Sequence, residues 1–187
     1  MPVMSDRSQT AAPPVAVPYI YRLDALYARA GLPQPYRSLL VHHNDMTPTL
    51  EQFHGGSIHL RILHREERGE YYFRQVALVL DGSDKPVEFG ANKVSLVLFP
   101  PKARQLILEE RVPLGTVLKL CDIAHSTAAK AFFRVVPDAL ITSVLGLNDH
   151  PVLYGRKATI MDAQKRPLSE IVEILPPALR SDIDHAR

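Results

Sequence analysis

The segment Glu70-Tyr-Tyr-Phe-Arg-Gln-Val-Ala-Leu-Val-Leu80 decides the fold, because it predicts a strand that ends at the turn residues Asp81-Gly82. Successive side chains of a strand point to opposite faces of a sheet. One face therefore carries Tyr72, Arg74, Val76, Leu78 and Leu80, and Arg74 is the only charge among these five. A guanidinium does not give up its proton, and its burial without a partner is costly. The pattern predicts an anion opposite Arg74, either an internal carboxylate or a bound ligand.

Other strands with a period of two surround this segment. Residues 58–63 precede it, and residues 87–99 follow it after the polar turn at 81–84. Strands joined by such short turns, with no helix between them, pair antiparallel. The end of the chain predicts a hairpin, in which strands 152–160 and 168–175 are joined by a turn at 162–165.

Helical periodicity flanks the strands on both sides. We expect helices over 19–30, 35–43, 101–108, 114–120 and 126–147, the last one broken at Pro137, and a capped helical turn near 45–53. Helices, three strands, more helices and a hairpin form an α+β pattern. The predicted architecture is a five- or six-stranded antiparallel sheet with helices on one side.

Length and composition are those of one ordinary globular domain. The chain has 187 residues, 46% hydrophobic and 22% charged, with a net charge of +2. We expect a disordered arm over 1–18, a single domain over 19–177 and a polar tail over 178–187. The charge is too mild to indicate nucleic acid, and no apolar run approaches the ~18–20 residues that cross a membrane. The single cysteine and the start without an apolar core segment predict a cytoplasmic protein without a signal peptide.

Local motifs for metal or nucleophilic chemistry are absent from the sequence. The histidines at 42, 43, 54, 59 and 64 share no face and form no HExxH pattern, so we expect no metal site. Cys121, Ser126 and Ser143 lie in no recognised nucleophile motif, and no glycine-rich phosphate loop is present. We expect no cofactor.

Glu173 is the counterpart of Arg74 near the end of the chain. It shares a strand face with Ile171 and Leu175, whereas Glu170, three residues earlier, points to the other face. An internal Arg74–Glu173 ion pair and a ligand held between these two residues both fit the pattern.

Four separated segments form a recognisable series: Asp45-Met46-Thr47, Tyr72-Phe-Arg-Gln-Val76, Val112-Pro-Leu-Gly115, and the hairpin that joins Tyr154-Gly-Arg-Lys157 to Glu173-Ile-Leu-Pro176. In this order, over about residues 37–177, they resemble the chorismate pyruvate-lyase family, which makes 4-hydroxybenzoate.

The resemblance implies an antiparallel sheet with a ligand enclosed beneath helical flaps. It implies that Arg74 and Glu173 are catalytic, and that Met46, Arg74, Leu114 and Glu173 bind the substrate. Arg74 would hold the ring carboxylate and Glu173 the ring hydroxyl. The expected reaction eliminates pyruvate from chorismate without a metal or cofactor, in ubiquinone biosynthesis or aromatic secondary metabolism. The expected state is a monomer or small homo-oligomer, without nucleic-acid or membrane partners.

Three features depart from the family pattern. The segment before Gly155 is longer, which predicts that helical residues 128–147 form a flap over the pocket and slow product release. The spacing before Glu173 differs from the family's by about one residue, which leaves Glu170 as an alternative to Glu173 in the site. Residues 88–93 lack an arginine that the family pattern leads us to expect. The same fold occurs as the ligand-sensing domain of bacterial regulators, so a non-catalytic binder of aromatic carboxylates is the alternative function. About 35 residues precede the match, too few for the winged-helix domain of those regulators.

Overall fold

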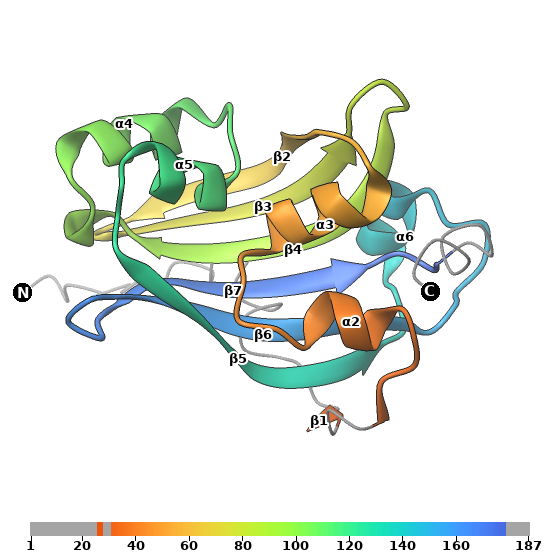
Figure 1. The fold of residues 1–187 in the computed structure, drawn as a ribbon. Coiled ribbons are helices and arrows are strands. Elements are labelled where there is room, and N and C mark those ends of the chain that lie inside the picture. Colours follow the sequence, from red (N-terminus) through yellow and green to blue (C-terminus); the bar gives the residue numbers. More distant parts are fainter. Residues whose placement is uncertain (1–25, 28–30, 179–187) are drawn as a thin grey trace, which may run out of the picture.

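One antiparallel sheet organises the chain, and the computed structural model describes residues 26–27 and 31–178 of it. The sheet order is β1-β5-β6-β7-β4-β3-β2 (Figure 1). Six strands are long, and β1 is a two-residue strand that pairs with β5 at one edge. The bounds are Leu26–Tyr27 for β1, Ile58–Arg68 for β2, Tyr71–Leu80 for β3, Lys85–Ser95 for β4, His125–Val135 for β5, Leu153–Asp162 for β6 and Pro167–Leu175 for β7. The predicted α+β class with a six-stranded antiparallel sheet is confirmed.

Helices cover the sheet face that carries Tyr72 and Leu78 (Figure 1). They are α2 (Tyr36–Leu40), α3 (Met46–His54), α4 (Pro101–Glu109) and α5 (Leu114–Leu120), with the 3-10 turn η2 at Leu96–Leu98. Gly55 ends α3 at φ 67°, a backbone conformation that glycine adopts without strain. A further helix, α6 (Ala139–Leu145), packs on the opposite face against Phe89 and Phe133.

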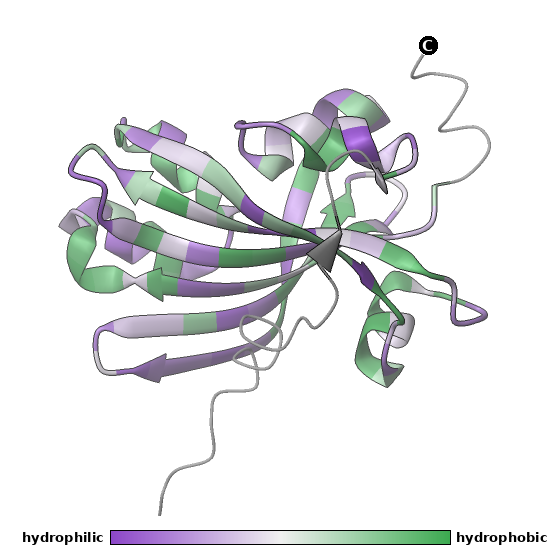
Figure 2. Ribbon diagram, turned by 90° about the horizontal axis from the view of Figure 1, so that it is seen from below, coloured by the Kyte–Doolittle hydropathy of each residue, from purple (hydrophilic) through white to green (hydrophobic). Residues whose placement is uncertain are grey.

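The helix-covered face holds two separate apolar clusters. One lies beneath α4 and α5 and includes Tyr72, Ile107 and Ile171. The other lies beneath α2 and α3 and includes Leu50 and Leu78. Figure 2 shows hydrophobic and hydrophilic residues distributed along the strands. The central strands β3, β4 and β7 are buried over most of their length, because the α6 side of the sheet also carries an apolar cluster. The two clusters leave a region between them in which polar side chains gather.

The predicted helix over 126–147 is wrong before its expected break at Pro137, whereas α6 confirms a helix after that break. Its first half is β5, which pairs with β6 from His125↔Asp162 to Val135↔Leu153, with a register shift between Ala129 and Ala131. Alanine favours helix locally, but pairing with a neighbouring strand and burial of Phe132 and Phe133 decide the conformation. The predicted flap therefore does not exist: β5 belongs to the sheet, and α6 lies on the face away from the other helices.

Other boundaries also differ from those expected. In the predicted helix 19–30, residues 26–27 form strand β1, and the other residues lie outside the described part of the chain. The predicted arm 1–18 and the tail residues 179–187 also lie outside it. The third strand ends at Ser95 rather than Phe99, since η2 follows it. In the described ranges no helix is long and apolar enough to span a membrane.

Candidate ligand-binding site

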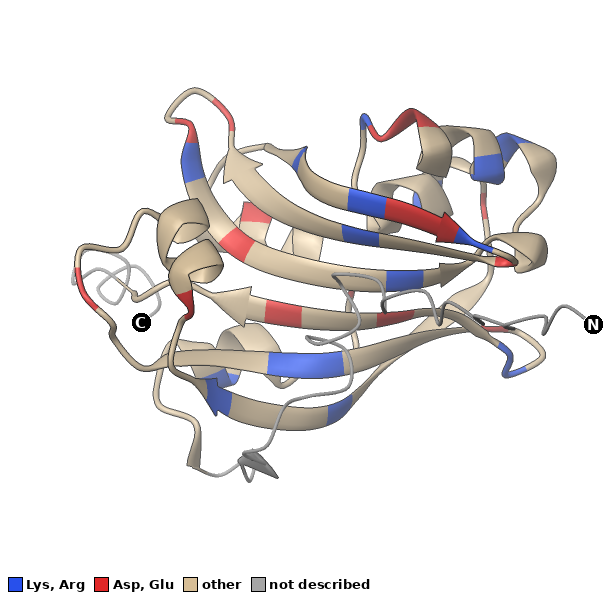
Figure 3. Cartoon of the chain, turned by 180° about the vertical axis from the view of Figure 1, so that it is seen from behind, with Lys and Arg blue, Asp and Glu red and all other residues tan. Residues whose placement is uncertain are grey.

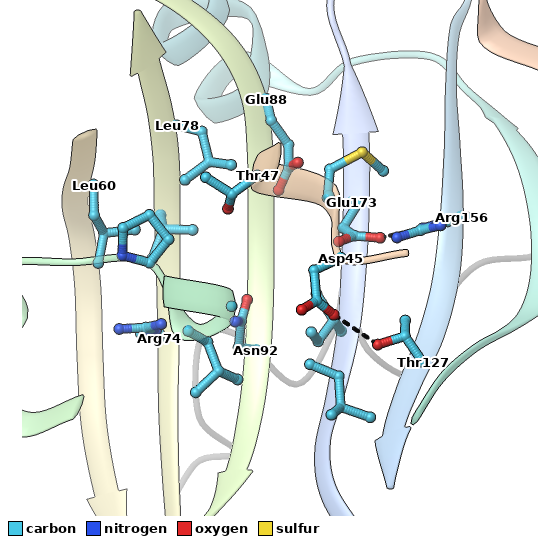
Figure 4. A pocket seen from close by; sticks show the side chains of 17 residues that line it. Asp45, Thr47, Leu60, Arg74, Leu78, Glu88, Asn92, Thr127, Arg156 and Glu173 are labelled. Atoms are coloured by element: carbon cyan, nitrogen blue, oxygen red, sulfur yellow. Dashed lines mark hydrogen bonds and ion pairs between the residues drawn. The ribbon is translucent and has the colours of Figure 1, made fainter. Parts of the chain in front are cut away.

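A cavity of about 50 Å³ lies on the helix-covered face, between the two apolar clusters and below the starts of α3 and α5. This is room for roughly four water molecules. Apolar walls come from Leu60, Val76, Leu78, Ile160 and Ile171. The polar lining residues are Asp45, Thr47, Arg74, Glu88, Asn92, Thr127, Arg156 and Glu173, and Figure 4 shows how they converge.

Arg74 lies at one end of the cavity and is almost completely buried, with 1% of its surface exposed. Its Nε and Nη1 have no hydrogen-bond partner among the described residues. Burial lowers the pKa of Arg74, and the neighbouring Tyr72 and Glu110 partly oppose this, but a guanidinium stays protonated in proteins. The structure therefore contains a buried, cavity-lining cation with two nitrogens that no described residue satisfies. An anionic ligand would complete it.

The Arg74–Glu173 ion pair considered from the sequence is not formed. Glu173 instead accepts a hydrogen bond from Nε of Arg156, its cross-strand partner on β6, and forms an ion pair with it. The other Arg156 nitrogens donate to main-chain oxygens of Leu40 (3.2 Å), His42 (3.4 Å) and Asn44 (3.4 Å). Arg156 thus joins the sheet to the segment that leads into α3.

His42 completes the surroundings of Arg156. Its Nε2 lies 2.7 Å from the Leu39 carbonyl oxygen, so this nitrogen donates and carries the proton. Its Nδ1 then accepts from Nη1 of Arg156 at 3.3 Å. Burial and the neighbouring guanidinium lower the pKa of His42, which favours this neutral tautomer.

Glu88 of β4 is a second buried carboxyl group beside Glu173. Only 3% of its surface is exposed, and its Oε2 has no hydrogen-bond partner in the described part of the chain. Burial raises the pKa of Glu88 well above its ordinary value, repulsion from Glu173 adds to this, and Arg156 opposes it. These surroundings disfavour the ionised form of Glu88.

The four positions implied by the family resemblance all line this one cavity. Met46 and Leu114 are the first residues of α3 and α5, and Arg74 and Glu173 lie on β3 and β7. The starts of the two helices lie close together. A Cβ added to Gly115 would lie only 3.2 Å from Cβ of Asp45, so the close approach favours a glycine at this position. Sequence reasoning brought these four residues together correctly in space, although their roles stay predictions.

Asp45 closes the cavity toward an outer groove, whose lining it also shares. Thr127 of β5 donates to its Oδ1 at 2.8 Å, and Nε2 of His125 lies 3.0 Å from its Oδ2. These contacts hold the start of α3 against the first residues of β5. The sequence did not predict these contacts, because Thr127 was expected in a helix over 126–147 and not in a strand of the sheet.

Glu170 lies on the opposite face of the sheet from Glu173. Its carboxylate lies 3.2 Å from Nζ of Lys93 and 3.9 Å from Nζ of Lys157. Charged residues of both signs are spread over the strands in Figure 3, which views the molecule from behind. Glu170 is therefore no substitute for Glu173 in the cavity.

Arg156, Glu88 and Asn92 were not among the residues predicted for the site. Arg156 shares one face of β6 with Tyr154, Ala158 and Ile160, which is the same signal of a charge on an apolar strand face that identified Arg74. Within the described residues there is no cluster of three His, Cys, Asp or Glu side chains that could hold a metal, and Cys121 packs against the α4–α5 cluster.

Solved structures with a similar fold are known, although sequence comparison finds no match. No protein-family model matches the chain, and no curated protein sequence matches it. PhnF from Mycobacterium smegmatis matches with a TM-score of 0.57 and 13% identity over 72% of this chain and 64% of that chain. The effector domain of PhnF matches with a TM-score of 0.55 and 13% identity over 70% of this chain and 87% of its own length.

A third match is the ligand-binding domain of a protein assigned to the GntR family of transcriptional regulators, from Bordetella bronchiseptica. Its TM-score is 0.50 with 15% identity, over 67% of this chain and 92% of that chain. This chain thus spans less than two thirds of the longer PhnF structure but most of the isolated effector or ligand-binding domains. At such identities the matches show the fold alone, which is the chorismate lyase-like fold of regulator ligand-binding domains.

Proposed function

We propose that this chain is a small-molecule-binding domain whose cavity takes up a small organic acid, with the ligand carboxylate on Arg74. The single observation that carries the proposal is the burial of Arg74 beside a cavity, with two nitrogens that have no hydrogen-bond partner within residues 26–27 and 31–178. Leaving such a group without an anion is costly, and a carboxylate matches the fork of a guanidinium. Matches to regulator ligand-binding domains support binding over catalysis.

An aromatic or similarly compact acid suits the other walls. Leu60, Val76 and Leu78 lie on the strands beside Arg74, and Ile160 and Ile171 line the cavity as well. An apolar body would pack against these side chains while its carboxylate meets Arg74. Benzoates are therefore the probes of choice.

Chorismate lyase activity is the second candidate. It is favoured by the convergence of Met46, Arg74, Leu114 and Glu173 on one cavity, as the family resemblance implies. Glu173 is tied to Arg156, so it would orient a ligand hydroxyl through its remaining acceptor capacity. Cleavage would release pyruvate and leave a hydroxybenzoate.

Calorimetry with benzoate and 4-hydroxybenzoate tests the proposal. Arg74→Met should weaken binding by about 30-fold or more, since a charge-assisted bidentate contact contributes on the order of 2–4 kcal/mol. The matched control is Arg61→Met, because Arg61 lies on the neighbouring strand β2, partly exposed and paired with Asp84. Equal affinity of wild type and Arg74→Met would overturn the proposal. Incubation with chorismate, followed by assay of pyruvate and hydroxybenzoate, separates the lyase from the binder.

A further inference from the structure

We infer that Glu88 is a second ligand-contacting group, a neutral carboxylic acid that donates a hydrogen bond to an uncharged oxygen at the end of the ligand opposite Arg74. The ligand class is then a monoanion with a carboxylate at one end and a carbonyl, ether or hydroxyl oxygen at the other. This inference rests on the proposed function and specifies which acids the cavity takes.

The position of Glu88 sets the length of the site. Arg74 is the cross-strand partner of Asn92, and Glu88 lies four residues earlier on β4, opposite Leu78. Four residues of strand span roughly 13 Å between Cα atoms, so the two groups enter the cavity from opposite ends. Figure 4 shows Arg74 apart from Glu88, with the Glu88 carboxyl group near Thr47 and Glu173.

Gly90 keeps the sheet clear between the two ends. It is the residue between Glu88 and Asn92 on the same face of β4, and a Cβ there would lie 2.9 Å from Cγ2 of Val76 and 3.1 Å from Oε1 of Glu88. Because glycine has no side chain, nothing from this position separates the Arg74 end from the Glu88 end.

The unpartnered Oε2 is the observation that points to a ligand. Glu88 is more than nine-tenths buried and lines the cavity, yet Oε2 lacks a hydrogen-bond partner in the part of the chain that the structure describes. A buried polar group of this kind is costly unless a water or a ligand satisfies it. As a neutral acid, Glu88 can donate one hydrogen bond there.

The charges around Glu88 favour its neutral form. Glu173 on β7 repels a second carboxylate, Arg156 on β6 is already paired with Glu173, and Arg74 on β3 lies at the far end. Burial is the largest contribution to the raised pKa of Glu88.

Two further ionisable groups face this region from the helix side. His42 is neutral beside Arg156, and the Asp45 carboxylate lines the cavity at the start of α3. Arg74 is then the cavity-lining guanidinium that still needs an anion, and the Asp45 and Glu173 carboxylates disfavour a second negative charge on the ligand. A dianion such as a phosphate monoester or a dicarboxylate fits these charges less well than a monoanion.

Three probes test the inference by calorimetry at pH 7: benzoate, formylbenzoate (3- and 4-isomers) and terephthalate. At least one formylbenzoate should bind about 10-fold tighter than benzoate, because one added hydrogen bond is worth about 1–1.5 kcal/mol. Terephthalate, a dianion, should bind more weakly than that formylbenzoate.

Variants of Glu88 separate its role from that of Arg74. Glu88→Gln keeps a donor and should preserve the preference for formylbenzoate, whereas Glu88→Leu should abolish it while benzoate still binds. Glu170→Gln, on the opposite face of the sheet, is the matched control and should change neither. If both Glu88 variants keep the preference, or if terephthalate binds best, the inference is wrong although Arg74 still binds carboxylates.

Thermal unfolding without ligand gives an independent measurement. A raised pKa means that folded Glu88 keeps its proton where the unfolded chain has lost it, so stability falls as the pH rises above the unfolded pKa, about 4.3. Glu88→Gln removes this loss, and its Tm advantage over wild type should grow from pH 5 to pH 8. A constant difference would show that Glu88 is ionised and would overturn the inference. Failure of all benzoates to bind through Arg74 would overturn the proposed function, and the ligand class with it.

Discussion

Arg74 and Arg156 are the two largest fully buried side chains of the described structure, and they lie on the same sheet face, yet they have opposite surroundings. Arg156 donates to Glu173 and to three main-chain oxygens and reaches Nδ1 of His42. Arg74 has two nitrogens without any partner among the described residues. Both side chains are fully buried, but they differ in how many of their nitrogens have a hydrogen-bond acceptor.

The difference separates a structural arginine from a binding arginine. A buried charge that the protein itself satisfies joins parts of the fold, as Arg156 joins β6 to the segment before α3. A buried charge that the protein leaves unsatisfied lowers stability and is retained where a ligand supplies the anion. The four experiments below test this distinction.

Arg156→Met should have the largest effect. It leaves Glu173 buried without its cation, next to Glu88, and removing one partner of a buried pair costs about 3–5 kcal/mol. Urea unfolding at pH 7 measures the loss. A loss below about 1 kcal/mol would mean that the cluster tolerates an unpaired Glu173, and the structural role assigned to Arg156 would be wrong.

Glu88 and Glu173 should be strongly coupled. In Glu173→Gln, Glu88 loses its repulsive neighbour and faces an unpaired Arg156, so its pKa falls and it can replace the missing carboxylate. The double variant Glu88→Gln with Glu173→Gln has no such substitute. Its loss of unfolding free energy should exceed the sum of the single losses by about 1–3 kcal/mol in a double-mutant cycle. Additive losses would show that Glu88 cannot reach Arg156.

Arg74→Met should stabilise the ligand-free protein. It removes a buried guanidinium that has two nitrogens unsatisfied by the described residues and replaces it by an apolar side chain of similar length, which we expect to raise the unfolding free energy by about 1–2 kcal/mol. Arg156→Met is the opposite case on the same face. A clear destabilisation by Arg74→Met would mean that Arg74 has an internal anion after all.

Two buried hydroxyls repeat the comparison at a smaller scale. Thr127 donates to Asp45, so Thr127→Val should cost about 1 kcal/mol, the value of one hydrogen bond with its acceptor left behind. Ser169 is buried, and its Oγ has no partner in the described ranges, so Ser169→Ala should change stability by less than about 0.5 kcal/mol. Equal losses from both would indicate that packing, and not hydrogen bonding, governs these sites.

Much of the sheet could be predicted because its signal is local. Alternation over β2, β3 and the β6–β7 hairpin, with polar turns between them, predicted antiparallel pairing, and the structure confirms it. Strand β5 was missed because its alanines favour helix and its bulge interrupts the alternation. Pairing with β6 stabilises β5 as a strand, and β6 lies too far along the chain for the residue pattern of β5 itself to indicate this pairing.

The candidate site divides in the same way. From the sequence alone, Arg74 is a charge on an apolar strand face, and Glu173 and Glu170 point to opposite faces, because alternation follows from strand geometry. Only the tertiary structure decided that Glu173 pairs with Arg156, that Nε and Nη1 of Arg74 have no hydrogen-bond partner among the described residues, and that the surroundings of Glu88 raise its pKa. Partner choice between buried charges depends on strand order and on distances of a few ångströms, and these are properties of the assembled sheet.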